Sequence, residues 1–266
     1  MMKKFIPSFI CLTVLLGTVL VSPVGATPTV DEIINRANLA AYYGGDDGRA
    51  NVLMTISDSQ GRTRTREFVI LRKDLKDGGE QKFYVYFKKP SDVRKMVFMV
   101  HKHIDKDDDR WMYLAKLDLV KRIAGSDKRT SFVGSNFFYE DVSGRGVAED
   151  RHELVEETDK EYVLKNIPKN PAEVEFASYT VWIDKQSFLP VKAEYFDRAD
   201  RKYRMVEALE TEIVQGFPTV VKSRVKDLLT GGETVSEFKN VKYNIGLKEK
   251  IFTERYLRRP PKEVRK

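Results

Sequence analysis

The stretch that decides the fold runs from Arg110 to Val142 and reads RWMYLAKLDLVKRIAGSDKRTSFVGSNFFYEDV. Its first five residues alternate in character as the side chains on the two faces of a strand do. Residues 119–123 predict the hairpin partner of that strand, and residues 124–129 form a polar, turn-rich linker. Four aromatic side chains follow and have to be buried, so we expect this segment to fold back over an apolar concavity. They are Phe132, Phe137, Phe138 and Tyr139.

The first 26 residues have the pattern of a cleaved export signal. Two lysines precede an apolar core, and Val24-Gly25-Ala26 supplies the small residues that a signal peptidase needs. We expect cleavage after Ala26, which leaves residues 27–266 as a single domain in the periplasm. The alternative is an uncleaved membrane anchor, but the apolar run is short for a span of ~20 residues. Cys11, the only cysteine, lies within the signal, so the mature chain is predicted to contain no disulfide.

The charge of the chain is modest and dispersed. Lysine and arginine together number 47 against 40 aspartates and glutamates, which gives a net charge of +7. Nucleic-acid binding usually requires a clustered basic face, whereas the two signs alternate here along predicted strands, as in residues 62–67. We therefore expect no nucleic-acid partner. The basic end at residues 258–266 is either a contact for acidic lipid headgroups or a disordered tail.

A helix is predicted near the start of the mature chain, and strands follow it. Thr29 and Glu32 form a capping box, apolar residues recur at helical spacing from Val30 to Ala41, and Gly44-Gly45 ends the pattern. From residue 51 the period changes to two, which predicts strands. The predicted strands are residues 51–57, 62–72, 82–88, 95–104, 110–114, 119–123, 153–157, 161–166, 176–184, 190–197, 202–209, 219–227 and 233–243. A short helix is predicted within residues 248–257.

The short connections between these strands favour an up-and-down antiparallel meander without βαβ units. A meander of this length has to curl, or its edge strands keep unpaired backbone N–H and C=O groups exposed. The strands at residues 82–88 and 95–104 are apolar on both faces, which a sheet with one solvated face does not require. We therefore predict a mainly β fold with few helices, in which a curled sheet is covered on each face.

No constellation of catalytic or metal-binding residues emerges. His101 and His103 share a strand face, but a metal needs further ligands, and a surface strand end is the plainer interpretation. The aspartates of residues 105–109 lack the glycine and the glutamate of a calcium loop. The mature chain offers no cysteine nucleophile, and it has neither a nucleophile elbow nor a phosphate-binding glycine loop. We predict no catalytic residue, no metal and no cofactor.

Aromatic and methionine side chains are the positive signal. They supply large, adaptable apolar surface, which fits either an ordinary core or the lining of a cavity. A curled sheet with two apolar faces, an amphipathic helix and an aromatic loop in mid-chain together favour a lidded cavity for a lipid-like ligand. The residues that we predict to line it are Phe83, Val85, Met96, Phe98, Val100, Trp111, Tyr113, Phe137 and Phe138.

The central stretch resembles the signature segment of the outer membrane lipoprotein-sorting protein family, relatives of the periplasmic lipoprotein carrier LolA and its receptor LolB. The resemblance is carried by residues 111–114, 122–123, 125–129, 131–132, 134–135 and 138–141. Ala115 and Asn136 stand where relatives tend to have a proline and an acid, which puts only the local loop shape in doubt. The resemblance implies a LolA/LolB-like fold: a strongly curved antiparallel incomplete β-barrel, covered by helices, whose cavity holds acyl chains.

The same resemblance implies a periplasmic, non-catalytic carrier, expected to be a monomer, that moves lipoprotein acyl chains or other lipids toward the outer membrane. Shielding such chains from water is worth ~0.8 kcal/mol per methylene. An inner-membrane transporter or an outer-membrane receptor is the expected protein partner. The alternative is a periplasmic adaptor whose cavity is filled by its own side chains and which docks to an inner-membrane lipid transporter of the resistance-nodulation-division class. A hydrolase that depends on His101 or His103 is the least favoured interpretation.

Overall fold

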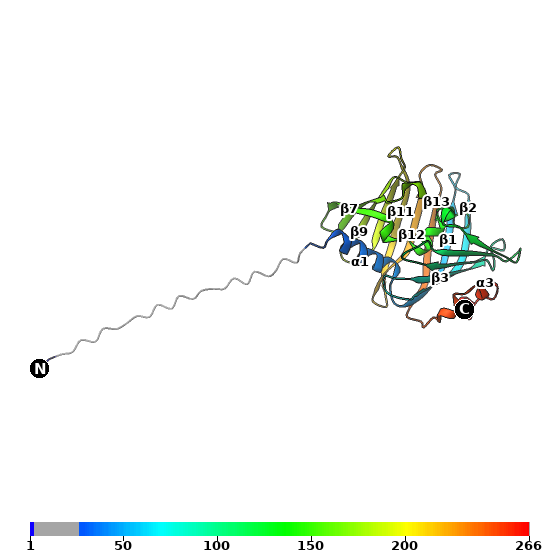
Figure 1. Ribbon diagram of the computed structural model, residues 1–266, viewed down its shortest axis with the longest axis horizontal. Coiled ribbons are helices and arrows are strands. Elements are labelled where there is room, and N and C mark those ends of the chain that lie inside the picture. The colour runs from blue at the N-terminus through cyan, green and yellow to red at the C-terminus, as the bar shows by residue number, and fades with distance from the viewer. Residues whose placement is uncertain (3–26, 266) are drawn as a thin grey trace.

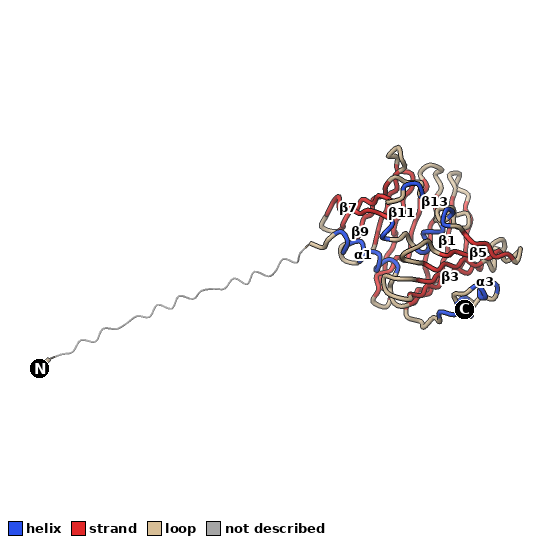
Figure 2. The backbone as a smooth tube through the Cα atoms, in the orientation of Figure 1, coloured by secondary structure: helices blue, strands red, loops and turns tan. Residues whose placement is uncertain are grey.

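The computed structural model describes residues 1–2 and 27–265, so the predicted export signal lies almost entirely outside the described residues. Strands dominate the described chain, and the helices are few and short (Figures 1 and 2). The strands are β1 (Asp47–Ser57), β2 (Thr63–Asp74), β3 (Gln81–Lys89), β4 (Val97–Lys102), β5 (Asp109–Leu114), β6 (Leu119–Ile123), β7 (Asp150–Glu157), β8 (Glu161–Pro168), β9 (Ser178–Asp184), β10 (Pro190–Phe196), β11 (Lys202–Val214), β12 (Phe217–Asp227) and β13 (Glu233–Tyr243). The α-helices are α1 (Val30–Tyr42), α2 (Tyr139–Ser143) and α3 (Glu254–Arg258).

All thirteen strands belong to one antiparallel, curved, open sheet, which confirms the predicted fold class. Its order is β6-β5-β4-β3-β2-β1-β13-β12-β11-β10-β9-β8-β7. The sheet is therefore two meanders, not the single one that the sequence suggested. They meet where β1 pairs with β13, for example at Met54 opposite Ser236. The first and last strands thus lie at the centre of the sheet, while β6 and β7 form its edges.

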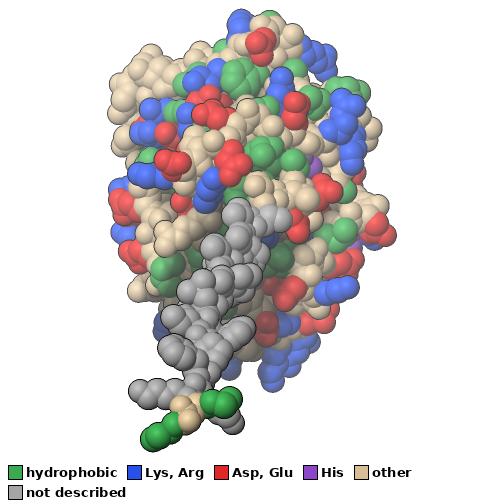
Figure 3. Space-filling view, turned by 90° about the vertical axis from the view of Figure 1, so that its left-hand side faces the viewer, with side chains coloured by type: hydrophobic (Ala, Val, Ile, Leu, Met, Phe, Trp, Pro, Cys, Tyr) green, Lys and Arg blue, Asp and Glu red, His purple; other side chains and the backbone are tan. Residues whose placement is uncertain are grey.

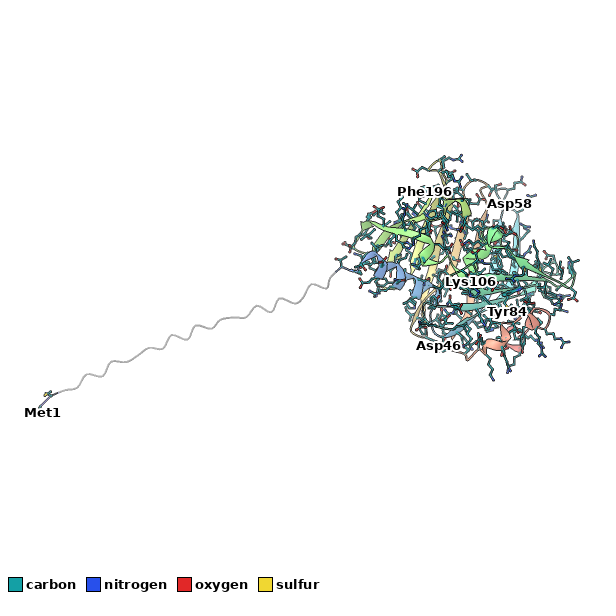
Figure 4. All side chains as sticks on the ribbon, viewed as in Figure 1. Met1, Asp46, Asp58, Tyr84, Lys106 and Phe196 are labelled. Carbon is teal, nitrogen blue, oxygen red and sulfur yellow. The ribbon has the colours of Figure 1, made fainter. Side chains whose placement is uncertain are left out.

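The turns between strands gather at the two ends of the sheet. Figure 4 shows Asp58, in the turn after β1, at the same end as Phe196, the last residue of β10. Asp46, which precedes β1, lies toward the opposite end. The long connection from β6 to β7, residues 124–149, joins the two edges of the sheet. We call it the roof segment, and it contains α2 and two short 3-10 turns.

The roof segment covers the concave face of β1–β5. Phe132, 2% exposed, packs with its ring centroid 5.4 Å from that of Phe98, and Tyr139 lies 5.1 Å from the same ring. Burial of such rings stabilises the fold mainly through the apolar area removed from water. The prediction that the aromatic loop folds back over an apolar concavity is confirmed.

The convex face of β2–β5 is covered by the C-terminal segment, residues 244–265. Phe252 and Leu257 are fully buried there against Leu71 and Tyr84. The Tyr84 hydroxyl donates to the Tyr256 carbonyl at 2.6 Å. Two covers on one half of the sheet explain why those strands are apolar on both faces.

Helix α1 covers the other half of the concave side (Figure 1). It begins at the predicted capping box, in which the Glu32 amide donates to the Thr29 hydroxyl at 3.2 Å. Ile33 and Ala37 are buried in a cluster with Leu164 of β8 and Ile183 of β9. Within the described residues no helix has the length and apolar character that a bilayer crossing needs.

Candidate functional site

A cavity of about 490 Å³ lies between the concave face of the sheet, α1 and the roof segment. That volume is within the range of ordinary ligand sites. Most of the lining side chains are apolar, and they come from both halves of the sheet and from both covers. They include Ile34, Ala37 and Ala41 of α1, Ala50, Met54, Phe68, Ile70, Phe83 and Val85 of β1–β3, Phe132, Phe137 and Val142 of the roof segment, and Val181, Ile183, Ala193, Val206, Ala208, Val220, Phe238 and Val241 of β9–β13.

The space exists because small residues occupy inward positions of β1, β10 and β11. Ala193 of β10 and Ala208 of β11 line the cavity, as do Gly48 and Ala50 of β1. Large side chains at the equivalent positions of β3 and β4 instead meet the roof segment and fill the interior. Alanine at inward positions of predicted strands is the signal in the sequence that indicates this space.

Three of the predicted lining residues do line the cavity: Phe83, Val85 and Phe137. Met96, Phe98 and Val100 are on the same side, but they pack in the solid core beneath Phe132 and Tyr139. Phe138 contacts two guanidinium groups, with that of Arg204 4.4 Å and that of Arg129 4.9 Å from its ring centroid. Ligand contact by the three lining residues stays a prediction.

Trp111 and Tyr113 lie on the wrong face for the cavity. Trp111 is directly opposite Met99 in the β4–β5 pairing, so both point to the convex side, and Tyr113 follows two residues later on that side. The neighbouring residue Met112 points to the concave core instead. Because both faces of β5 are buried, the alternation of its side chains carried no information about which face is concave.

Buried ion pairs stabilise the roof segment internally and attach it to the second half of the sheet. Glu140, 2% exposed, accepts from Arg129 at 2.7 Å and lies 3.5 Å from both Lys128 and Arg145. Arg145 also binds Asp150, at the start of β7, at 2.9 Å. Groups this buried are expensive to separate, since a lone charge would remain in a poorly solvated site.

A second part of this network reaches the turn before β9 and strand β11. Arg129 donates to Glu175 at 2.6 Å, and the Tyr203 hydroxyl donates to the same carboxylate at 2.7 Å. Burial raises the pKa of Glu175, but the hydrogen bonds from Arg129 and Tyr203 outweigh it, so the pKa lies below its usual range. The carboxylate therefore stays ionised and holds the roof segment at neutral pH.

Lys102, at the end of β4, holds the last turn of α2. Its ammonium donates to the carbonyls of Ser143 at 2.6 Å and Gly144 at 3.3 Å, and it lies 5.2 Å from the Tyr42 ring centroid. Cations favour the carbonyl end of a helix. Burial lowers the pKa of Lys102. The contact joins the roof segment, the first half of the sheet and the end of α1 at one point.

The three histidines have separate structural partners. His101 contacts the Phe252 carbonyl at 2.8 Å, and His103 lies between Glu80 at 2.9 Å and Asp109 at 3.1 Å. His152 lines the cavity, where its two ring nitrogens contact Asn166 Oδ1 at 2.6 Å and the Val147 carbonyl at 2.9 Å. Among the described residues no group of three or more histidine, cysteine or acidic side chains is arranged to hold a metal.

Comparison with known proteins places the chain in a family. A DUF1329 family protein from Desulfovibrio piger superimposes with a TM-score of 0.78 at 29% identity, over 86% of this chain and 97% of that one. A putative outer membrane lipoprotein-sorting protein domain from Vibrio parahaemolyticus gives a TM-score of 0.77 at 27% identity, with the same coverage. A family model described as "Uncharacterized protein" matches residues 79–259, more than half of the chain. The chain belongs to the family that this model describes, and it is similar to the lipoprotein-sorting protein domain from Vibrio.

The fold of the chain is also that of a LolA superfamily protein. A LolA superfamily protein from Nitrosomonas europaea matches 86% of this chain and all of that one, with a TM-score of 0.66 and 19% identity, which supports the fold alone. No curated protein matches the chain significantly. The resemblance inferred from residues 109–142 is thereby confirmed.

Proposed function

We propose that the protein is a periplasmic, non-catalytic carrier that binds lipoprotein acyl chains or other lipids in its cavity and moves them toward the outer membrane. The observation that carries this proposal is the apolar cavity of about 490 Å³ under α1 and the roof segment. The proposed working unit is the single domain of residues 27–266, released after Ala26.

The chemistry of the lining suits an alkyl chain. Each methylene transferred from water to this surface contributes ~0.8 kcal/mol. The volume of about 490 Å³ lies within the range of ~300–1,000 Å³ for ligand pockets, which suits one acyl chain. Phe238 of β13 lines the cavity and is only half-buried. Part of its apolar surface is therefore available to a ligand.

A carrier needs a donor and an acceptor for its cargo. We propose an inner-membrane transporter or an outer-membrane receptor in these roles, and the similarity to a putative outer membrane lipoprotein-sorting protein domain supports cargo transfer between them. The adaptor alternative required a cavity filled by its own side chains, and the open volume favours the carrier over it. The face in Figure 3 carries intermingled acidic and basic side chains, which fits a solvated surface.

The proposal is tested by what co-purifies with the protein. Mass spectrometry of a solvent extract should reveal acyl lipids, and a fluorescent fatty-acid probe should compete with them. Ala193→Phe fills the cavity and should weaken probe binding at least tenfold, whereas Ala199→Phe, in the exposed turn after β10, should leave binding unchanged. A folded Ala193→Phe protein with wild-type affinity would overturn the proposal.

A further inference from the structure

The sheet is split between β12 and β13 over half of their length. Their ladder runs only from Lys222 opposite Glu237 to Lys226 opposite Glu233. Within the part of the chain that the structure describes, residues 217–221 of β12 have no ladder partner in β13. Residues 238–243 of β13 pair with β1 on their other side. We call the space between these two unpaired segments the slit.

Irregularities in both neighbouring ladders accompany the slit. The β11–β12 register shifts between Ala208 and Glu210 and again before Thr211. The β1–β13 register shifts between Arg49 and Asn51, where Asn240 of β13 has a positive φ of 52°. Bulges bend a strand and increase its twist. The β11–β12 hairpin and β13 therefore diverge at the end of the sheet that carries Asp46.

The cavity reaches the slit from inside. Pro218, Thr219 and Val220 line the cavity on the β12 side, and Val241 and Tyr243 line it on the β13 side. Side chains of consecutive strand residues point to opposite faces. A cavity that contacted only one face of β12 would touch every second residue. This cavity touches three consecutive residues, so it also reaches the edge of β12 that borders the slit.

Side chains bridge the slit, and the loop after α1 packs against it, since a Cβ at Gly44 would lie 3.4 Å from Tyr243 Cε1 and 3.6 Å from Phe217 Cβ. The Thr219 and Tyr243 hydroxyls are 2.9 Å apart, and the Phe217 and Tyr243 ring centroids are 5.1 Å apart. The Gln215 side chain accepts from the Tyr243 amide at 2.8 Å and donates to its carbonyl at 3.2 Å. Gln215 is exposed, so water replaces these hydrogen bonds readily. The roof segment, in contrast, is held by buried ion pairs.

The convex side of the slit is lined by lysines. Lys222 lies opposite Glu237, and Lys239 and Lys242 of β13 lie opposite Asn51 and Arg49 of β1, on the face away from the cavity. Glu210 and Glu237 pair with Lys222 and Lys239, both at 3.0 Å. Lys242 is exposed. A head group that remains outside while its tail occupies the cavity meets more cations than anions here.

We propose that an anionic single-chain amphiphile enters the cavity sideways, tail first through the slit, with its head group left on the convex face beside Lys239 and Lys242. This inference rests on the proposed carrier function and adds the route and the class of ligand. The roof segment stays closed during entry, and the side chains of Gln215 and Tyr243 swing aside instead.

Thiol cross-linking tests the route, because Cys11→Ser removes the only cysteine of the sequence. In that background, Gln215→Cys with Asn244→Cys is joined by a short bis-maleimide to lock the slit. Asn136→Cys with Thr234→Cys, whose native side chains bond at 2.8 Å, locks the roof segment to β13 as the matched control. Stopped-flow fluorescence then follows the uptake of a fluorescent C16 carboxylate. We expect the slit lock to slow uptake at least tenfold and the roof lock to change it less than twofold.

The head group is tested by charge reversal. Lys239→Glu with Lys242→Glu should weaken binding of the C16 carboxylate at least fivefold and leave the matching C16 alcohol within twofold. Lys226→Glu, on β12 beyond the slit, is the control and should affect neither. Unchanged uptake in the slit-locked protein, or equal effects on acid and alcohol, overturns this inference alone. A wild-type protein that takes up neither probe overturns the carrier function, and the route with it.

Discussion

Trp111 lies directly opposite Met99 in the β4–β5 pairing, and both side chains pack beneath the C-terminal segment rather than in the cavity. Trp111 is 7% exposed and Met99 is fully buried. The His101 ring adds an edge contact to the indole, with centroids 4.9 Å apart. The largest side chain of the signature stretch therefore stabilises the fold instead of contacting a ligand.

Trp111→Ala should lower the free energy of unfolding by about 3–5 kcal/mol, the usual cost of removing a buried aromatic side chain. Probe affinity of the folded fraction should stay within twofold of wild type, because the cavity is on the other face. Urea denaturation and probe titration measure the two quantities. Trp182→Ala is the control, since that ring is only half-buried and lies 4.1 Å from the Lys192 ammonium. A selective loss of binding in folded Trp111→Ala would contradict this assignment.

Glu140→Gln should destabilise the protein by about 3–5 kcal/mol, because it leaves Arg129, Lys128 and Arg145 with less negative charge in a buried site. The amide also cannot accept from all three cations. Chemical denaturation measures the effect. Glu156→Gln, on exposed β7, should stay within about 0.5 kcal/mol of wild type. Equal effects at the two positions would show that the ion pairs of Glu140 within the roof segment contribute no more to stability than an exposed carboxylate.

Gly144→Ala should be more damaging than an alanine at another glycine with positive φ. A Cβ at Gly144 would lie 2.4 Å from Tyr42 Cζ, in backbone with φ of +75°. Gly61 has φ of +77°, and among the described atoms nothing lies within 4 Å of its Cβ position. Gly61→Ala therefore measures the backbone cost, on the order of 1 kcal/mol. Gly144→Ala should exceed it by at least about 1 kcal/mol in thermal or urea unfolding. Indistinguishable variants would mean that Tyr42 moves freely.

Titration of the Asp74 carboxyl should lower the free energy of unfolding as pH rises. Burial raises its pKa from 3.8 to about 6, although Arg72 at 3.3 Å opposes the shift. A carboxyl with a raised folded pKa contributes stability below its unfolded pKa and loses it as pH rises through the folded value. The stability of wild type relative to Asp74→Asn should therefore fall by on the order of 2 kcal/mol between pH 4 and pH 7. The comparison cancels the other carboxylates. A difference that is constant across this range would contradict the shift.

The strands and α1 could be predicted from the sequence because their signals are local. The capping box at Thr29 and the period of two fix where elements begin and what type they are. Strand pairing is not local, and nothing in the alternation of β1 or β13 indicates that they are neighbours. The sequence therefore predicted the curled sheet but not the junction of its two halves.

The sequence predicted an apolar cavity, but only some of the residues that line it. Large side chains such as Phe98 suggested apolar surface, yet they fill space, whereas Ala193 and Ala208 leave it open. The ion pairs of Arg129 and Glu140 were hidden for a different reason. In the sequence Arg129 ends a polar linker and Glu140 follows the aromatic cluster, and only the fold of the roof segment brings them together in a buried site.

The pairing of β1 with β13 determines when an enclosed interior appears during folding. The hairpins of β1–β6 and of β7–β12 form from contacts close in the sequence, but neither half surrounds anything. The strand that joins them is synthesised last, and contacts between distant segments form slowly. A nascent chain that emerges from its N-terminus thus has no hydrophobic interior to offer until residue 243 is available. The interior can therefore become enclosed only after β13 has paired with β1.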